Sequence, residues 1–383
     1  MDTTSGHARW MHNTRLGFTL VELLVVITII GILASLITVA AVGALRKARE
    51  TEIKAEIDQI ATALETYKDK ANAYPTNCQV DDANLAAEPA SSTTPLDEGR
   101  VLSDLKYHLK RAFSRQQEPP ELIARLAGLT PTGTALPAGQ GLQGGMSAGE
   151  AIVFWLGGFS SDPEYPISGE GGPSYRIDTI GDPDNRTLDP IESRKWVFPF
   201  DVGRLAPRDA DGYFPEPAGN ANDPTGKRFI EYSITINGQT QNRRINFWQY
   251  IPRKSEQPYL YFDTSRNPPT PGADPPAATA LSKLGEDEDG DGTADGLHVH
   301  AFKKLSDSAG ATTAVQYINP DKFQIIHCGI DEEWDVAAFE RMAVHDPPPP
   351  DGYLLYPDGP FIGEIADTIV NFAPVTRIED AQP

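Results

Sequence analysis

The sequence predicts an α+β protein in which a long N-terminal helix, transmembrane in its first half and amphipathic in its second, packs on an antiparallel β-sheet head domain with large loop insertions. Three observations predict this class. An almost uninterrupted apolar run occupies residues 18–45. Apolar residues then recur every three or four positions as far as residue 71. After residue 173, short runs rich in β-branched and aromatic residues alternate with turns rich in Gly and Pro.

Composition divides the chain into five parts. With 33 Gly and 33 Pro among 383 residues, long loops are expected between the regular elements. The parts are a leader peptide at 1–17, a transmembrane helix at 18–45, its amphipathic continuation at 46–75, an enlarged α/β insertion region at 76–256, and a C-terminal β region with acidic calcium-type loops at 257–383.

The charge of the chain restricts its partners. The formal net charge is −21, whereas binding to nucleic-acid phosphates requires a basic face. The sequence therefore excludes a nucleic-acid partner and fits an extracytoplasmic domain or one that handles cations. The two cysteines, Cys78 and Cys328, could form one disulfide in an oxidising compartment or remain separate thiols.

The apolar run contains one ionisable residue, Glu22. At about 1.5 Å per helical residue the run is long enough to span a bilayer of roughly 30 Å. A carboxylate inside such a segment is costly and usually has a partner or a function. Cleavage between Gly17 and Phe18 would create that partner, because the new amino group of Phe18 could neutralise Glu22 of a neighbouring copy.

The helix is predicted to continue beyond the membrane. Its apolar residues lie on one face, and Pro75 marks its end. The residues of this face are Ile53, Ile57, Ile60, Leu64 and Tyr67.

Further elements follow in the insertion and C-terminal regions. Residues 97–126 predict two short helices separated at Pro119-Pro120, and residues 148–159 are apolar on all sides, which allows a buried helix or a strand. Strands are predicted at 174–178, 196–200, 229–236, 245–251, 259–262 and 323–328.

The segment Gly17-Phe18-Thr19-Leu20-Val21-Glu22 resembles the processing and methylation motif of type IV pilins and type II secretion pseudopilins. The resemblance implies cleavage after Gly17 by a prepilin peptidase, N-methylation of Phe18, and a role for Glu22 in assembly. A start at Met11 would give the leader MHNTRLG, which is similar in length to the family's short leaders. Many family members carry a proline where this chain has Val39, so a straighter helix is expected.

The resemblance extends to both ends of the chain and is closest to major pseudopilins. ETYKDKANAYPTN is similar to the end of the family's long helix, and residues 257–262, 323–331 and 363–369 are similar to its closing strands and acidic loop. Residues 77–257 are mostly extra to a major pseudopilin. Because major pseudopilins hold calcium in the C-terminal loop, the resemblance implies a calcium site at Asp331 and Asp367.

A second calcium candidate is an acidic loop with alternating carboxylates. Aspartates at its first, third, fifth and ninth positions and Gly292 at the sixth form the front half of a calcium loop, although a solvated acidic loop remains the alternative. His298 and His300 share a face of a predicted strand without an evident third ligand, which favours surface histidines. The carboxylates of the loop are Asp287, Asp289, Asp291 and Asp295.

These observations predict a structural subunit of a type II secretion pseudopilus or a related type IV pilus-like filament, and not an enzyme. The expected partners are further copies, other pseudopilins or pilins, the prepilin peptidase and the inner-membrane assembly platform. The expected location is the inner membrane, with a single pass and the C-terminal domain in the periplasm or on the cell surface. The alternative is a membrane-anchored binding module with the same export signal. The sequence leaves open whether the filament is a pseudopilus or a pilus and whether the subunit is major or minor.

Overall fold

The computed structural model of the chain forms two compact units, Met1–Arg49 and Glu50–Pro383. The residues that the structure describes are 19–76, 96–134, 142, 145–181, 191, 194–206, 229–265, 279–282, 296–299, 301–305, 315–335, 338–339 and 354–382.

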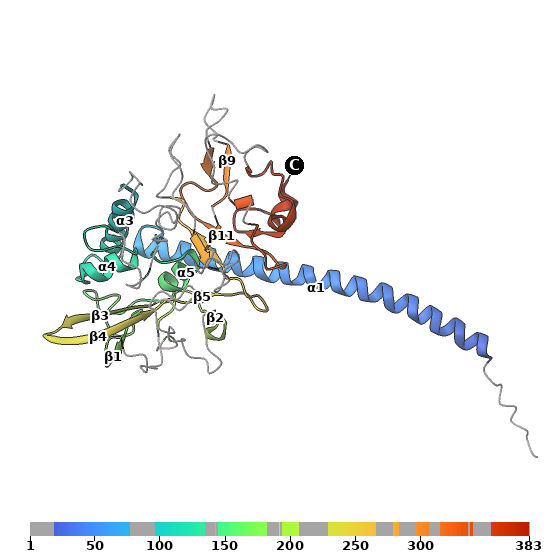
Figure 1. Cartoon of the computed structure of the whole chain (residues 1–383), viewed down its shortest axis with the longest axis horizontal. Helices are drawn as coiled ribbons and strands as arrows, with labels where there is room; N and C mark the ends of the chain where they lie inside the picture. Colours follow the sequence, from blue (N-terminus) through green and yellow to red (C-terminus); the bar gives the residue numbers. More distant parts are fainter. Residues whose placement is uncertain are drawn as a thin grey trace, which may run out of the picture. The chain divides into compact units, whose positions relative to one another are not determined.

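Helix α1 runs without a break from Leu20 to Ala71 (Figure 1). It begins after Thr19, whose hydroxyl accepts a hydrogen bond from the Glu22 N–H, while the Glu22 carboxylate accepts one from the Thr19 N–H. This reciprocal pair is a capping box, which satisfies two donors at the helix start. After Ala71, Asn72 adopts a left-handed conformation with φ of 60°, and Pro75 follows. The long helix predicted from the sequence is confirmed.

Three shorter helices cover residues from the insertion region: α3 (Leu96–Ala112), α4 (Pro120–Leu126) and α5 (Ala148–Leu156). The break between α3 and α4 lies where Pro119-Pro120 was expected to cause it, with Pro120 as the first residue of α4. The apolar segment 148–156 is a helix because Ser147 and Glu150 close a capping box at its start.

The strands form small antiparallel sheets, which confirms the α+β class. Strand β4 (Gln239–Asn246) lies between β1 (Tyr175–Ile177) and β3 (Phe229–Ile236). Strand β11 (Gln324–His327) lies between β12 (Ile369–Val370) and β6 (Leu260–Phe262). Two-stranded pairs join β2 (Leu205–Ala206) with β5 (Gln249–Tyr250), β7 (Thr279–Ser282) with β8 (Gly296–Val299), and β9 (Lys303–Leu305) with β10 (Val315–Tyr317). The 3-10 helices are η2 (Val202–Arg204), η3 (Gly363–Asp367) and η4 (Ile378–Ala381).

The second half of α1 supplies one side of the main core. Ile57, Ile60 and Leu64 are fully buried and belong to one hydrophobic core with residues of α3, α4, α5, β3 and β4. The chain after α1 is fixed at its backbone, because the Trp155 indole donates to the Thr76 carbonyl at 2.8 Å and the Tyr261 hydroxyl donates to the Pro75 carbonyl at 2.6 Å. The amphipathic face predicted from the sequence is therefore the buried face.

Two of the strand predictions are wrong. Residues 196–200 form no strand, because the N–H groups of Val197 and Phe198 both bond to the Leu156 carbonyl at the end of α5 instead of to a neighbouring strand. The expected strand 245–251 is divided, since β4 ends at Asn246 and β5 begins at Gln249. The polar residues 239–244 also belong to β4 and were not predicted as strand. The hairpin turn at Asn237-Gly238, where both residues have positive φ, pairs them with β3.

Candidate assembly segment and acidic turn

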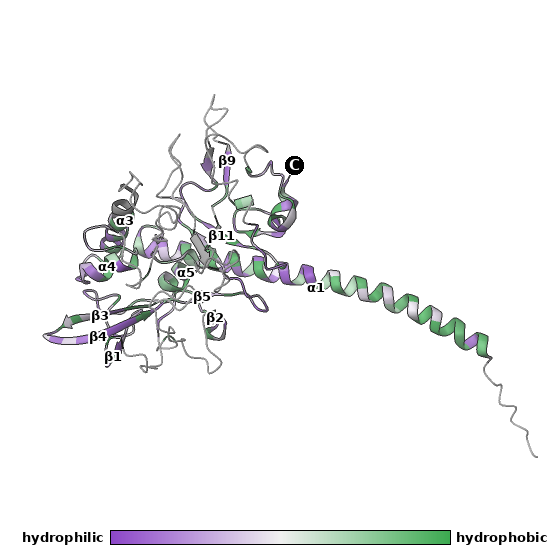
Figure 2. Ribbon diagram, in the orientation of Figure 1, coloured by the Kyte–Doolittle hydropathy of each residue, from purple (hydrophilic) through white to green (hydrophobic). Residues whose placement is uncertain are grey.

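The first half of α1 exposes a continuous apolar surface. Large apolar side chains from Leu20 to Leu45 are exposed, and the helix is long and apolar enough to cross a membrane by length and composition (Figure 2). In water this surface would be a large apolar patch, which soluble monomers rarely present. The segment thus fits a lipid environment or a protein partner.

Glu22 lies in the first turn of this apolar surface. Its Oε2 accepts hydrogen bonds from the Thr19 backbone N–H at 2.9 Å and from the Thr19 hydroxyl at 2.8 Å. The side chain is thus held at the start of the helix within a single chain. Gly17 and Phe18, the residues predicted to be cleaved and methylated, lie outside the described residues.

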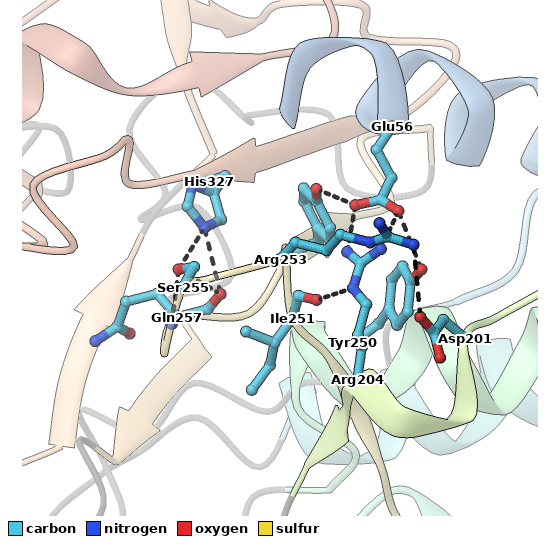
Figure 3. A network of polar contacts seen from close by, with 10 residues as sticks. Glu56, Asp201, Arg204, Tyr250, Ile251, Arg253, Ser255, Gln257 and His327 are labelled. Atoms are coloured by element: carbon cyan, nitrogen blue, oxygen red, sulfur yellow. Dashed lines mark hydrogen bonds and ion pairs between the residues drawn. The ribbon is translucent and has the colours of Figure 1, made fainter. Parts of the chain in front are cut away.

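A partly buried ion pair attaches part of the insertion region to the second half of α1 (Figure 3). The Glu56 carboxylate accepts hydrogen bonds from both terminal nitrogens of Arg204, at 2.7 and 2.5 Å. The hydroxyls of Tyr250 and Tyr259 donate to the same carboxylate at 3.0 and 2.5 Å. Arg204 also donates from Nε to the Ile251 carbonyl at 2.8 Å, so its position is fixed on both sides.

The protonation of Glu56 follows from these contacts. Burial alone would raise its pKa, but the hydrogen bonds and the charge of Arg204, together with the Tyr259 and Tyr250 hydroxyls, outweigh burial and hold the pKa below its usual value. The pair is therefore ionised at neutral pH.

The C-terminal segment is attached to α1 through Glu50 and Lys54, which precede Glu56 on the helix. The Lys54 ammonium donates to the carbonyls of Val370 and Ala373 at 2.7 and 3.1 Å. Arg377 lies 4.0 Å from the buried carboxylate of Glu50. Positions four residues apart share a helix face. Glu50 and Lys54 therefore both attach the C-terminal segment to the same face of α1.

The turn after β11 brings Asp331 and Asp367 together, although 35 residues separate them in the sequence. Their side chains lie within hydrogen-bonding reach of each other. The Ile330 N–H donates to Asp367 Oδ2 at 3.1 Å, and Asp367 Oδ1 is buried without a hydrogen-bond partner. Gly329, with φ of 114°, makes this approach possible, because a Cβ there would lie 2.4 Å from the Asp367 carboxyl carbon.

The two carboxyl groups cannot both ionise easily. Burial, together with the negative charge of Asp331, raises the pKa of Asp367 to about 6. Burial also raises the pKa of Asp331. A pair of this kind is stabilised by a shared proton or by a cation.

Most of the remaining predicted site residues lie in parts of the chain that the structure does not describe. Asp287, Asp289, Asp291 and Asp295 lie outside the described residues, as do Cys78 and His300. Cys328 is buried, and because its predicted partner Cys78 is not among the described residues, the disulfide stays a prediction. Among the described residues, no group of three or more His, Cys, Asp and Glu side chains could hold a metal ion.

Sequence reasoning missed several polar groups with little exposure, among them Glu56 and His327. Glu56 was not singled out, because nothing local on the helix distinguishes it from the exposed acids nearby, and its partner Arg204 lies 148 positions away. His327 is fully buried, accepts from the Gly329 N–H at Nδ1 (3.1 Å), and lies 3.3 Å from the Gln257 carbonyl at Nε2. Burial lowers the pKa of His327 to about 4.

Comparison with known proteins identifies the N-terminal part of the chain. The prokaryotic N-terminal methylation motif matches residues 12–38. Type II secretion system core protein G of Aeromonas hydrophila is 42% identical over 79 residues, which cover 21% of this chain and 54% of that protein. The Pseudomonas aeruginosa protein of the same name is 39% identical over 79 residues (21% and 55%), and that of Escherichia coli K12 is 43% identical over 63 residues (16% and 43%). No solved structure matches the chain.

The chain therefore carries a prokaryotic N-terminal methylation motif, which leads into a long helix whose first half is exposed. Its matched region is homologous to type II secretion system core protein G. The chain spans about half the length of the curated relatives it matches.

Proposed function

We propose that the chain is a structural subunit of a type II secretion pseudopilus or a related type IV pilus-like filament. The observation that carries the proposal is the methylation motif at 12–38, continued by an exposed apolar helix that becomes buried from Glu50 onward. In this proposal a prepilin peptidase removes residues 1–17 and Phe18 becomes N-methylated. The mature chain crosses the inner membrane once, with its second unit in the periplasm, and is assembled by the inner-membrane platform with further copies or other pseudopilins.

Glu22 selects the register between neighbouring subunits. In the single chain Thr19 satisfies one oxygen of its carboxylate, but two neutral donors leave the negative charge uncompensated in an apolar medium. The amine of a processed neighbour supplies the missing positive charge. Apolar contacts between helices then have a preferred register, since any other register leaves a charge unpaired.

The proposed calcium site at Asp331 and Asp367 fits the residues present. Calcium takes six to eight oxygen ligands, largely carboxylates and carbonyls, and the buried Asp367 Oδ1 has no hydrogen-bond partner. The two carboxylates would hold the ion, which would offset their mutual repulsion and fix the turn. Backbone carbonyls and water would have to complete the coordination. The loop with Asp287, Asp289, Asp291 and Asp295 remains a second proposed site.

Substitution of Glu22 tests the filament function. Glu22→Ala should abolish incorporation into filaments while membrane insertion persists, and Glu22→Asp, which keeps the charge, should retain part of the incorporation. The measurement is the yield of sheared filaments against the membrane-bound pool. Normal assembly of Glu22→Ala would refute the role of Glu22, whereas the absence of filaments from the unchanged protein would favour a simple anchored binding module.

Calorimetric titration with calcium separates the two proposed calcium sites. Asp331→Asn plus Asp367→Asn should remove one binding step, and Asp289→Ala plus Asp291→Ala should remove the other. Heats equal to those of the unchanged protein in either variant would eliminate the corresponding site.

A further inference from the structure

Two oppositely charged surfaces of α1 stand out beside the apolar segment. The basic collar, Arg46, Lys47 and Arg49, follows the apolar residues directly, and its residues are exposed. The acidic stripe is the face of α1 that the rest of its unit leaves uncovered. Its exposed residues are Thr51, Glu52, Ala55, Asp58, Gln59, Thr62, Thr66, Asp69 and Lys70.

The acidic stripe is suited to another helix. Its residues recur at spacings of three and four, so they form one face, and the opposite face is buried in the core. Ala55, Thr62 and Thr66 are small, and both threonine hydroxyls are turned back onto helix carbonyls at 2.8 and 3.0 Å. The stripe carries three acids, Glu52, Asp58 and Asp69, and one cation, Lys70, while Asp58 also lies 3.4 Å from Lys54 outside the stripe. A neighbouring helix with positive charge could therefore approach closely.

The charge of the chain creates a need for such a contact. Residues 1–49 contain five Arg and Lys and two Asp and Glu, so the remaining 334 residues carry a net charge of −24. Copies brought together by their apolar segments would repel each other through these acidic units. Under the proposed orientation the collar also lies on the translocated side of the membrane, against the usual bias of Lys and Arg toward the cytoplasm. Basic residues placed against that bias indicate that the collar has an anionic partner in the assembled state.

We propose that the basic collar of one copy docks on the acidic stripe of a second copy, an inference that rests on the proposed filament function. The collar and the stripe are different surfaces, so each contact leaves one collar and one stripe open. A heterologous contact of this kind extends into an open filament instead of closing into a two-fold dimer. The electrostatic contact complements the Glu22–amine contact by setting the spacing of the subunits outside the membrane.

Charge reversal and swap in the full chain test the proposal. Arg46→Glu plus Arg49→Glu reverses the collar, and Glu52→Lys plus Asp58→Lys reverses the stripe. Each variant should lower the yield of copy-to-copy cross-links and filaments about tenfold, and the four changes combined should restore it because the surfaces are again complementary. Glu164→Lys plus Glu170→Lys, which reverses two exposed acids outside α1, is the matched control and should assemble normally. Rising salt should lower the yield of the unchanged protein.

Three outcomes would overturn the inference. If the unchanged protein assembles and neither reversal lowers its yield, the collar and stripe do not meet, while the filament function stands. If collar reversal alone acts, the fourfold variant is not rescued, and binding to vesicles with anionic phospholipid is lost, the collar binds lipid headgroups. If the unchanged protein gives no copy-to-copy cross-links at all, the filament function fails together with the inference.

Discussion

The Glu56–Arg204 pair should be a principal link between α1 and the insertion region. The two side chains are 16% and 14% exposed, and they are joined by two parallel hydrogen bonds, with two tyrosine hydroxyls on the same carboxylate. Removal of one partner of a buried pair leaves the other charge uncompensated, which costs about 3–5 kcal/mol. Because both side chains retain some exposure, we expect about 3 kcal/mol for Glu56→Gln.

A double-mutant cycle gives the contribution of the pair. Glu56→Gln and Arg204→Met should each lower the free energy of unfolding by about 3 kcal/mol, whereas the double variant should lose about 2 kcal/mol less than their sum. Asp58→Asn is the matched control: Asp58 is paired with Lys54 at 3.4 Å but is 57% exposed, so the change should cost less than about 0.5 kcal/mol.

The assay is urea unfolding of the full chain in detergent micelles, followed by tryptophan fluorescence. Since the pKa of Glu56 is lowered in the folded state, the stability it contributes is present above its usual pKa and is lost as the pH falls through the folded value. Glu56→Gln should therefore reduce the acid sensitivity of unfolding. If Glu56→Gln lowers the free energy of unfolding no more than Asp58→Asn does, the Glu56–Arg204 pair does not link α1 to the insertion region.

Three further perturbations test other parts of the structure. In calcium-free buffer, stability should fall as the pH rises through about 6, because the pKa of Asp367 is raised by burial and by Asp331. Asp367→Asn should remove this pH dependence. If the dependence persists in the variant, Asp367 is not its source. His327→Gln should reduce the loss of stability between about pH 6.5 and 4, where the unfolded but not the folded state binds the imidazole proton; an unchanged acid limb of the stability curve would refute this. Lys54→Met should increase proteolysis of the C-terminal segment, because two carbonyls lose their charged donor; unchanged digestion kinetics would show that Lys54 does not hold it.

Local sequence signals predicted the elements that depend on local physics. The length of α1, the break at Pro119-Pro120 and the strand at 229–236 follow from hydrophobic period and proline chemistry. The strand predicted at 196–200 is wrong because the N–H groups of Val197 and Phe198 bond to the Leu156 carbonyl at the end of α5, a tertiary contact that no local pattern records.

The sites, too, could be predicted from the sequence where their residues are neighbours in the chain, and not where the residues are far apart. The motif around Glu22 is contiguous, so the sequence alone locates it. The encounter of Asp331 with Asp367 was expected from the family resemblance and is present in the structure. The Glu56–Arg204 pair joins residues 148 positions apart, and pairs at that separation leave no signal in a single sequence.

Intact-mass and N-terminal analysis of the mature protein from the membrane tests the central claim most directly. The account predicts a chain that begins at Phe18 with an added methyl group on its amine, so that a cation is available to Glu22 of a neighbouring copy. A mature chain that still carries residues ahead of Phe18 would contradict the account, because the Glu22 carboxylate would then have no amine at Phe18 to pair with.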